Sequence, residues 1–408
     1  MSTEIIHESA TLKGAASDYW SRVKAGDIGA LPAILGLVAL CAIFGAMSDV
    51  FLTAGNFANL LTQAAAVIVI AMGLVFVLLL GEIDLSAGYA AGVSGAVLVI
   101  LITNHQVAWY IAFPISIMVG ALLGFILGSL VARIGIPSFV VTLAAFLAFQ
   151  GLLLLLAGEG GTIRIEDKTI LAVENSNLSP LLSWVFFIVV AVVYVGTGLN
   201  RLNTRRRAGL KTELVKLWVI KTASLLLITG GAVFALTVER SNNPDLVSLK
   251  GIPYVVPLIL FLLAVGTFVL GRTAFGRHIY AVGGNAEAAR RAGINVKRVR
   301  ISAFVICSSL AAVAGMIFAS RQNSISPTTG GSSTLLYAVG AAVIGGTSLF
   351  GGKGKMRDAI LGGLVVAVID NGMGLLGYAA GIKFIVTGLV LLVSAGVDAV
   401  SRRGSSVS

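Results

Sequence analysis

Runs of roughly 20 consecutive apolar residues recur along the whole chain, and they constrain its fold more than any other feature. Each run is long enough to cross the roughly 30 Å apolar core of a bilayer. Lipid offers no hydrogen-bond partner to backbone N–H and C=O groups, so each run must form a helix. Hydrophobic residues make up 57% of the chain and charged residues 12%, against about 25% charged in soluble chains. The sequence therefore predicts an all-α polytopic membrane protein.

We expect about twelve transmembrane helices in one transmembrane domain, residues 29–402. A polar N-terminal segment, residues 1–28, precedes this domain, and a short tail, residues 403–408, follows it. The expected spans are about 31–47, 60–80, 85–103, 110–132, 136–157, 181–199, 214–238, 253–271, 299–320, 334–350, 358–376 and 380–400.

The positions of the basic residues predict which side of the membrane each loop occupies. With the N-terminus inside, 22 of the 29 Lys and Arg residues fall on the cytoplasmic side and five in outer loops. This bias agrees with the positive-inside rule through all twelve spans. It predicts that both termini are cytoplasmic. It also explains the net charge of +11 by membrane topology, so we expect no nucleic-acid partner.

The longest strongly basic stretch, residues 272–300, contains the pattern of a short capped helix. Asn285 is a suitable N-cap, Glu287 lies in the expected first turn, and Gly293 is a typical stop. Gly283 and Gly284 would allow a sharp turn just before the cap. The stretch is either an ordinary basic loop or a docking element for a partner in the cytoplasm.

Three glycine-rich stretches predict irregular or closely packed helices. Gly81–Gly88 (GEIDLSAG) leaves few residues between two spans, so we expect a tight turn or a broken helix there. Its pattern G-x-x-[DS]-L-x-x-G recurs at Gly345–Gly352 (GGTSLFGG), by chance or as an internal repeat. Gly120, Gly124 and Gly128 form a small-xxx-small face that predicts tight helix packing, within one protomer or between protomers.

Several polar side chains fall within or at the ends of the expected spans. Carboxylates and amides suit an uncharged sugar or polyol, because together they satisfy hydroxyl groups as donors and as acceptors. The alternative is hydrogen bonding between helices, or capping of broken helices. The candidates for a hydrophilic substrate path are Glu82, Asp84, Ser86, Gln150, Asp370 and Asn371, with Gln63 as a further polar residue.

Sequence motifs of catalysis are missing. No Walker A loop is present, since Thr347 stands where its first glycine would be, so we do not expect the chain to hydrolyse ATP. HExxH, CxxC and GxSxG are also missing, and the three histidines are scattered. Cys41 and Cys307 both lie in apolar runs, as small buried hydrophobes do. We expect no catalytic residues, no metal site and no enzyme activity.

Several longer motifs resemble the sugar-type ABC importer permeases of the ribose/xylose/galactoside group. YAVGGNAEAARRAGINV at Tyr280–Val296 looks like their coupling-helix region, and DNGM at Asp370–Met373 is most similar to the D-xylose type. Ala87 departs from the Val that is usual in the family. The other supporting motifs are GEIDLSAG, IPSFVVTLAAFLAFQG, RTAFGRHIYA and VIGGTSLFGGKG, which bring the resemblance to nearly all of residues 60–400.

The resemblance implies a fold of ten core spans plus a two-span insertion at residues 181–238, with residues 272–300 as the cytoplasmic coupling loop. It implies a homodimer in the bacterial inner membrane, a periplasmic sugar-binding protein outside, and a separate ATPase subunit inside. That subunit would bind ATP and Mg, so we expect no cofactor on this chain. The coupling residues that it implies are Gly283, Gly284, Asn285, Glu287, Ala288, Ala289, Arg290, Arg291 and Gly293.

The expected function is that of the transmembrane subunit of an ATP-driven importer. It would pass a monosaccharide, D-xylose or another pentose, by alternating access. The alternative is a stand-alone secondary sugar transporter, coupled to protons through Glu82, Asp84 or Asp370.

Overall fold

The computed structural model describes residues 31–158, 161–209, 215–241, 243–245 and 247–405. The expected N-terminal segment, residues 1–28, and the end of the expected tail lie outside these ranges. The described chain separates into two compact units, and one of them contains Asn177–Ile252. The larger unit contains the described residues before Asn177 together with Pro253–Ala399.

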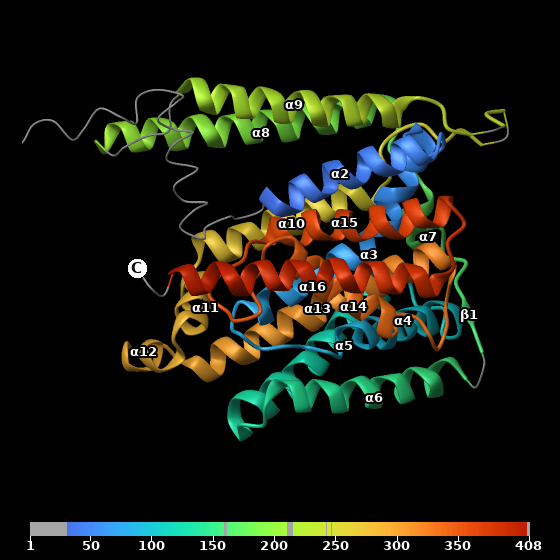
Figure 1. The fold of residues 1–408 in the computed structure, drawn as a ribbon. Helices are drawn as coiled ribbons and strands as arrows, with labels where there is room; N and C mark the ends of the chain where they lie inside the picture. Colours follow the sequence, from blue (N-terminus) through green and yellow to red (C-terminus); the bar gives the residue numbers. More distant parts are fainter. Residues whose placement is uncertain (1–30, 159–160, 210–214, 242, 246, 406–408) are drawn as a thin grey trace, which may run out of the picture. The chain divides into compact units, whose positions relative to one another are not determined.

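The larger unit is built almost entirely of helices (Figure 1). Two short strands, β1 (Ile163–Arg164) and β2 (Ser324–Ile325), pair antiparallel with Ile163 opposite Ile325. Its helices are α2 (Leu31–Met47), α3 (Ala54–Leu78), α4 (Ala87–Thr103), α5 (Trp109–Ser129) with the π-helical turn η2 (Leu130–Ile134), α6 (Ser138–Ala157), α7 (Lys168–Asn175), α10 (Val255–Arg272), α11 (Ala274–Gly284), α12 (Ala286–Arg291), α13 (Val296–Gln322), α14 (Ser332–Ile344), α15 (Met356–Leu375) and α16 (Ala380–Ser405).

The smaller unit holds two long apolar helices, α8 (Pro180–Arg207) and α9 (Val215–Thr237). Ser179 caps α8 by accepting a hydrogen bond from the backbone N–H of Leu182, and Pro180 occupies the first helical position. Beyond α9, the Glu239 carboxylate accepts hydrogen bonds from the backbone N–H groups of Arg240, Ser241 and Leu249. These contacts close the loop that follows α9.

An apolar helix overlaps each of the twelve segments predicted to span the membrane. Among the described residues, eight helices are long and apolar enough to cross, and four shorter apolar helices accompany them. The prediction of an all-α polytopic membrane protein is confirmed, whereas the number of spans and the sides of the termini stay predictions. Three boundaries differ from those predicted by six residues or more, and one of them is the end of α8, at Arg207 rather than 199. Thr53 caps α3 and starts it at Ala54 rather than 60, and α14 ends at Ile344 rather than 350, ahead of Gly346 with its φ of +117°.

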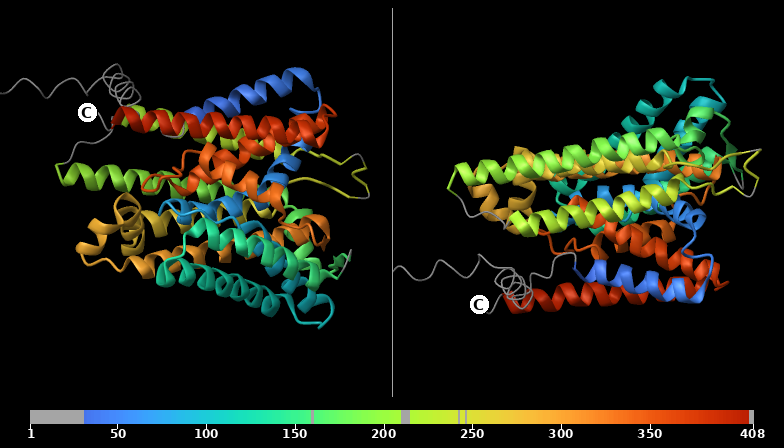
Figure 2. Two further views of the ribbon diagram at one scale, coloured as in Figure 1. Left: turned by 60° about the horizontal axis from the view of Figure 1, so that its bottom comes forward. Right: turned by 90° about the horizontal axis from the view of Figure 1, so that it is seen from above.

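The centre of the larger unit is formed by α3 and α13. α13 packs against α3, α4 and α5, and α15 packs against α3 (Figure 1). The backbones come close because small residues lie between them: a Cβ at Gly73 would be 2.9 Å from the carbonyl oxygen of Cys307. By contrast, α6 lies at one edge of the unit and is mostly exposed (Figure 2).

The glycine face of α5 packs within the protomer. A Cβ at Gly124 would lie 2.4 Å from the carbonyl oxygen of Phe304 on α13. Cβ atoms at Gly120 and Gly128 would come within 2.5 Å of Ser308 O and 2.8 Å of Ile301 Cα on the same helix. Of the two kinds of packing that the sequence left open, the structure shows the intramolecular one.

Candidate coupling and transport sites

The basic stretch at residues 272–300 forms α11, α12 and the first turn of α13. As predicted, Asn285 caps α12: its Oδ1 accepts a hydrogen bond of 2.9 Å from the backbone N–H of Ala288. The helix ends before Gly293, which has a φ of +84°. α12 lies at the end of the larger unit opposite α7 and β1 (Figure 1).

Charged side chains cover the exposed face of α12. Glu287 lies 2.9 Å from Arg290 and 3.1 Å from Arg291, at the i+3 and i+4 positions. Hydrogen bonds from Arg290 and Arg291 lower the pKa of Glu287. Their side chains are 50%, 71% and 79% exposed, so all three are open to a partner. Ala289 is buried and anchors the helix from beneath.

The prediction of a sharp turn at Gly283 and Gly284 is wrong. Both residues are helical, at the end of α11, and the direction of the chain changes at Asn285. Gly283 is needed for close approach instead. A Cβ there would lie 1.8 Å from the carbonyl oxygen of Leu79 and 2.9 Å from the backbone nitrogen of Gly352. A Cβ at Gly284 would meet no atom within 4 Å.

The two stretches with the pattern G-x-x-[DS]-L-x-x-G meet beside α11. The backbone N–H of Gly352 donates a hydrogen bond of 2.9 Å to the carbonyl oxygen of Leu79. The hydroxyl group of Tyr280 on α11 donates to the carbonyl oxygen of Gly354 at 2.7 Å. We call Leu79–Glu82, Gly283 and Gly351–Gly354 the glycine junction. It lies at the end of the helices that the charge distribution predicts to be cytoplasmic.

Residues 79–86 interrupt the helices between α3 and α4, in agreement with the expected tight turn or broken helix. Glu82 forms an ion pair of 3.1 Å with Arg300 in the first turns of α13. Asp84 is completely buried, and one of its carboxylate oxygens accepts hydrogen bonds from the backbone N–H and the hydroxyl group of Ser86. Asp84 and Ser86 therefore form a local contact, whereas Glu82 pairs with Arg300, which is distant in the sequence.

A second polar cluster lies at the opposite end of α3, where α3, α15 and α16 meet. Asn56 and Asn371 exchange two hydrogen bonds of 2.9 Å. The side-chain amide of Gln63 donates to Asp370, and Lys383 lies 3.5 Å from the same carboxylate. The sequence had nominated Gln63, Asp370 and Asn371 but not Asn56 or Lys383. A charged residue inside an apolar run was the signal that could have found Lys383, whereas Asn56 precedes the expected span and carried no such signal.

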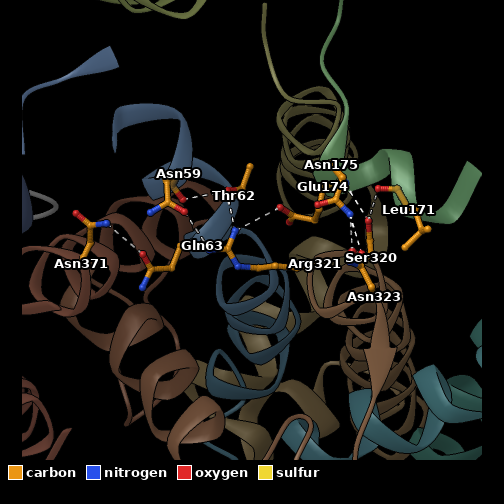
Figure 3. Close-up of polar contacts among 10 residues, drawn as sticks. All are labelled: Asn59, Thr62, Gln63, Leu171, Glu174, Asn175, Ser320, Arg321, Asn323 and Asn371. Atoms are coloured by element: carbon orange, nitrogen blue, oxygen red, sulfur yellow. Dashed lines mark hydrogen bonds and ion pairs between the residues drawn. The ribbon is translucent and has the colours of Figure 1, made fainter. Parts of the chain in front are cut away.

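Arg321 joins three elements beside this cluster (Figure 3). Its guanidinium group donates to Thr62 and Asn59 on α3 at 2.7 and 3.2 Å and lies 3.8 Å from Glu174 on α7. The side chain of Glu174 is 1% exposed, and burial raises its pKa to about 8 although Arg321 opposes the shift. The charge distribution had counted Arg321 only as one of the five basic residues assigned to outer loops.

The last candidate for the substrate path, Gln150, lies apart from both clusters. Its side chain is exposed on α6 and makes no hydrogen bond within the described part of the chain. An amide that faces lipid in the middle of a span is unfavourable unless it is hydrated or paired. In the same described ranges, no three His, Cys, Asp or Glu side chains come together as a metal site requires.

The sequence matches a known family of transport proteins. Residues 56–395 match the family described as the branched-chain amino acid transport system / permease component. The chain belongs to this family. The permease is therefore a transport subunit and not an enzyme, as predicted, and its apolar helices agree with a multi-pass membrane protein.

Its relatives include sugar permeases. It is 34% identical to the xylose transport system permease protein XylH of Escherichia coli (strain K12), over 95% of this chain and 96% of that protein. It is 32% identical to XylH of Haemophilus influenzae, over 91% and 96% of the two chains. It is 29% identical to the ribose import permease protein RbsC of Escherichia coli (strain K12), over 90% and 92%. No solved structure gives a significant match. The resemblance drawn from the motifs is thereby confirmed.

Proposed function

We propose that this permease is the transmembrane subunit of an ATP-driven importer of a monosaccharide, D-xylose or another pentose, in the bacterial inner membrane. The observation that carries the proposal is α12, a capped helix whose charged face is exposed. The same chain has no phosphate-binding loop of its own, so a partner must hydrolyse ATP. The two XylH relatives, which match more than 90% of this chain, support the choice of sugar.

The partners follow from this function. A separate ATPase subunit, which holds ATP and Mg, docks on α12 through Gly284–Gly293. A periplasmic sugar-binding protein delivers the sugar to the opposite side, and two copies of the permease form the transmembrane unit. Closure of the ATPases would move α12 as a rigid body and switch the permease between outward and inward access.

The substrate path would use polar side chains at both ends of the larger unit. We assign Asp370 and Asn371 to its outer part, because carboxylate and amide groups can hold sugar hydroxyls there. Glu82, Asp84 and Ser86 would lie near its cytoplasmic mouth, and Gln150 would face it from α6.

Reconstitution with the ATPase and binding protein tests this function. Gly284→Trp adds a large side chain where a Cβ meets no atom within 4 Å, so the permease should fold while ATPase association and sugar uptake are lost. Gly271→Trp is the matched control. A Cβ at Gly271 also meets no atom within 4 Å, and Gly271 lies in the last turn of α10, outside α12. Unchanged uptake in Gly284→Trp would overturn the proposal. Sugar uptake driven by a proton gradient without any ATPase would replace it with the secondary transporter.

A further inference from the structure

We propose that Gly283 and the Glu82–Arg300 ion pair are positioning residues, which transmit the movement of α12 to the glycine junction. This inference rests on the proposed function, because an ATPase must move α12. It assigns to Gly283 and to the ion pair of Glu82 a mechanical role inside the permease, in addition to the place of Glu82 near the cytoplasmic mouth of the proposed path.

The first support is that both helices flanking α12 hold the same short segment. α11, which precedes α12, packs against the break between α3 and α4, where Gly283 lies against the carbonyl oxygen of Leu79. α13, which follows α12, holds it through the 3.1 Å ion pair between Arg300 and Glu82. Leu79 and Glu82 are three residues apart in the break between α3 and α4.

The second support is the short, continuous connection on either side of α12. Asn285 alone separates α11 from α12, and it caps α12. The backbone N–H of Ile294 donates to the carbonyl oxygen of Ala289, and Asn295 caps α13 by accepting from Arg298 N. Every residue of this connection is hydrogen-bonded or helical. A displacement of α12 is therefore passed on to α11 and α13 instead of being absorbed by a flexible loop.

The third support is where the segment leads. Gly352 donates a hydrogen bond to Leu79, so a shift at Leu79 also reaches the loop between α14 and α15. On its other side the segment runs directly into buried Asp84 and the start of α4. Movement of α12 therefore reaches two interruptions of the helices at once, both at the predicted cytoplasmic end.

The contact at Gly283 is tested with Gly283→Ala, beside Gly271→Ala. Both add one methyl group to a helical glycine, but only the methyl at 283 meets backbone atoms, at 1.8 and 2.9 Å. We expect Gly283→Ala to associate with the ATPase subunit as the wild type does, yet to lose at least about tenfold in sugar uptake and in the ATPase activity stimulated by sugar-loaded binding protein. Gly271→Ala should keep all three properties.

The ion pair provides a second test that does not depend on tight packing. The Glu82 and Arg300 side chains are 13% and 31% exposed, so each charge keeps some contact with water. Glu82→Arg and Arg300→Glu should each lower uptake at least about fivefold while ATPase association is unchanged. The double exchange, which restores opposite charges, should recover most of the uptake.

The outcomes separate this inference from the proposed function. Normal uptake in Gly283→Ala and in both charge reversals would overturn the inference and leave the proposed function intact. A double exchange no better than the single ones, or loss of uptake in step with loss of ATPase association, would also overturn it. A wild-type permease that never associates with an ATPase would overturn the proposed function and this inference with it.

Discussion

Gly124→Ala should destabilise the permease because it forces α5 away from α13. The added Cβ would lie 2.4 Å from the carbonyl oxygen of Phe304, 2.8 Å from its carbonyl carbon and 2.8 Å from the Cα of Val305. All three are backbone atoms, so no side chain can rotate to make room. The helices must separate locally, which also loosens the neighbouring contacts of Gly120 and Gly128.

Two opposing terms set the size of the effect. Overpacking of a close contact typically costs about 1–3 kcal/mol. Replacing a helical glycine with alanine stabilises a helix by about 0.5–1 kcal/mol. The packing term is the larger, so we expect a net loss of roughly 1–2 kcal/mol for Gly124→Ala, and a greater loss for Gly124→Val.

The measurement is the free energy of unfolding in mixed detergent micelles, followed by circular dichroism. Gly151→Ala is the matched control: Gly151 lies in α6, and its added Cβ meets no atom within 4 Å. It should be neutral or slightly stabilising, since only the helix term applies. If Gly124→Ala proves as stable as Gly151→Ala, the idea that these glycines are required for close packing is wrong.

Three further predictions concern the predicted outer end. Hydrogen bonds, first from the backbone of Leu249, lower the pKa of Glu239 to about 2. Its contribution to stability is therefore present above about pH 4.5 and lost as the pH falls toward 2, and Glu239→Gln should lack this loss in thermal unfolding. Burial raises the pKa of Glu174 to about 8. The free energy of unfolding of the wild type should therefore fall by roughly 1 kcal/mol per pH unit as the pH rises from about 4.5 to about 8, because the buried carboxyl group favours the protonated form. The free energy of unfolding of Glu174→Gln should not show this fall. Asn371→Ala should cost about 1–2 kcal/mol by removing the two hydrogen bonds that buried Asn56 exchanges with Asn371, and a double-mutant cycle should show coupling.

Each of these outcomes has a contrary result. Parallel pH profiles of wild type and Glu239→Gln, or of wild type and Glu174→Gln, would contradict the corresponding hydrogen-bonding or burial argument. Additive effects of substitutions at Asn56 and Asn371 would mean that the exchanged hydrogen bonds contribute nothing to stability.

Local patterns in the sequence predicted the features that neighbouring residues determine. The apolar runs predicted the helices, because in lipid any run of that length must satisfy its own backbone. Asn285 and Gly293 predicted the bounds of α12, since a cap and a left-handed stop act within a few residues. Thr53 carried the same kind of signal at the start of α3, and it was missed because the apolar run begins later.

Contacts between distant segments could not be predicted in this way. The role of Gly283 was misjudged because its backbone is ordinary, and the reason for glycine lies in Leu79 and Gly352. The pair of Gln63 with Asp370 joins residues 307 positions apart, so nothing near either residue announces the other. Sequence reasoning found many of the polar residues but could not tell which of them meet.

The distribution of polar groups along α3 bears on where a sugar could pass. Residues 64–80 contain no polar side chain and are almost all buried, so the middle of α3 is a packed core element and offers a hydroxyl group nothing to bind. A continuous path between Asp370 and Asp84 must therefore run beside α3 along another helix. The exposed face of α6 carries Gln150 within its span. In a single copy this amide faces lipid, which is unfavourable, whereas in the proposed homodimer a path on that face could keep it hydrated. If the proposed homodimer forms, the second copy would enclose at Gln150 a path that one copy leaves open.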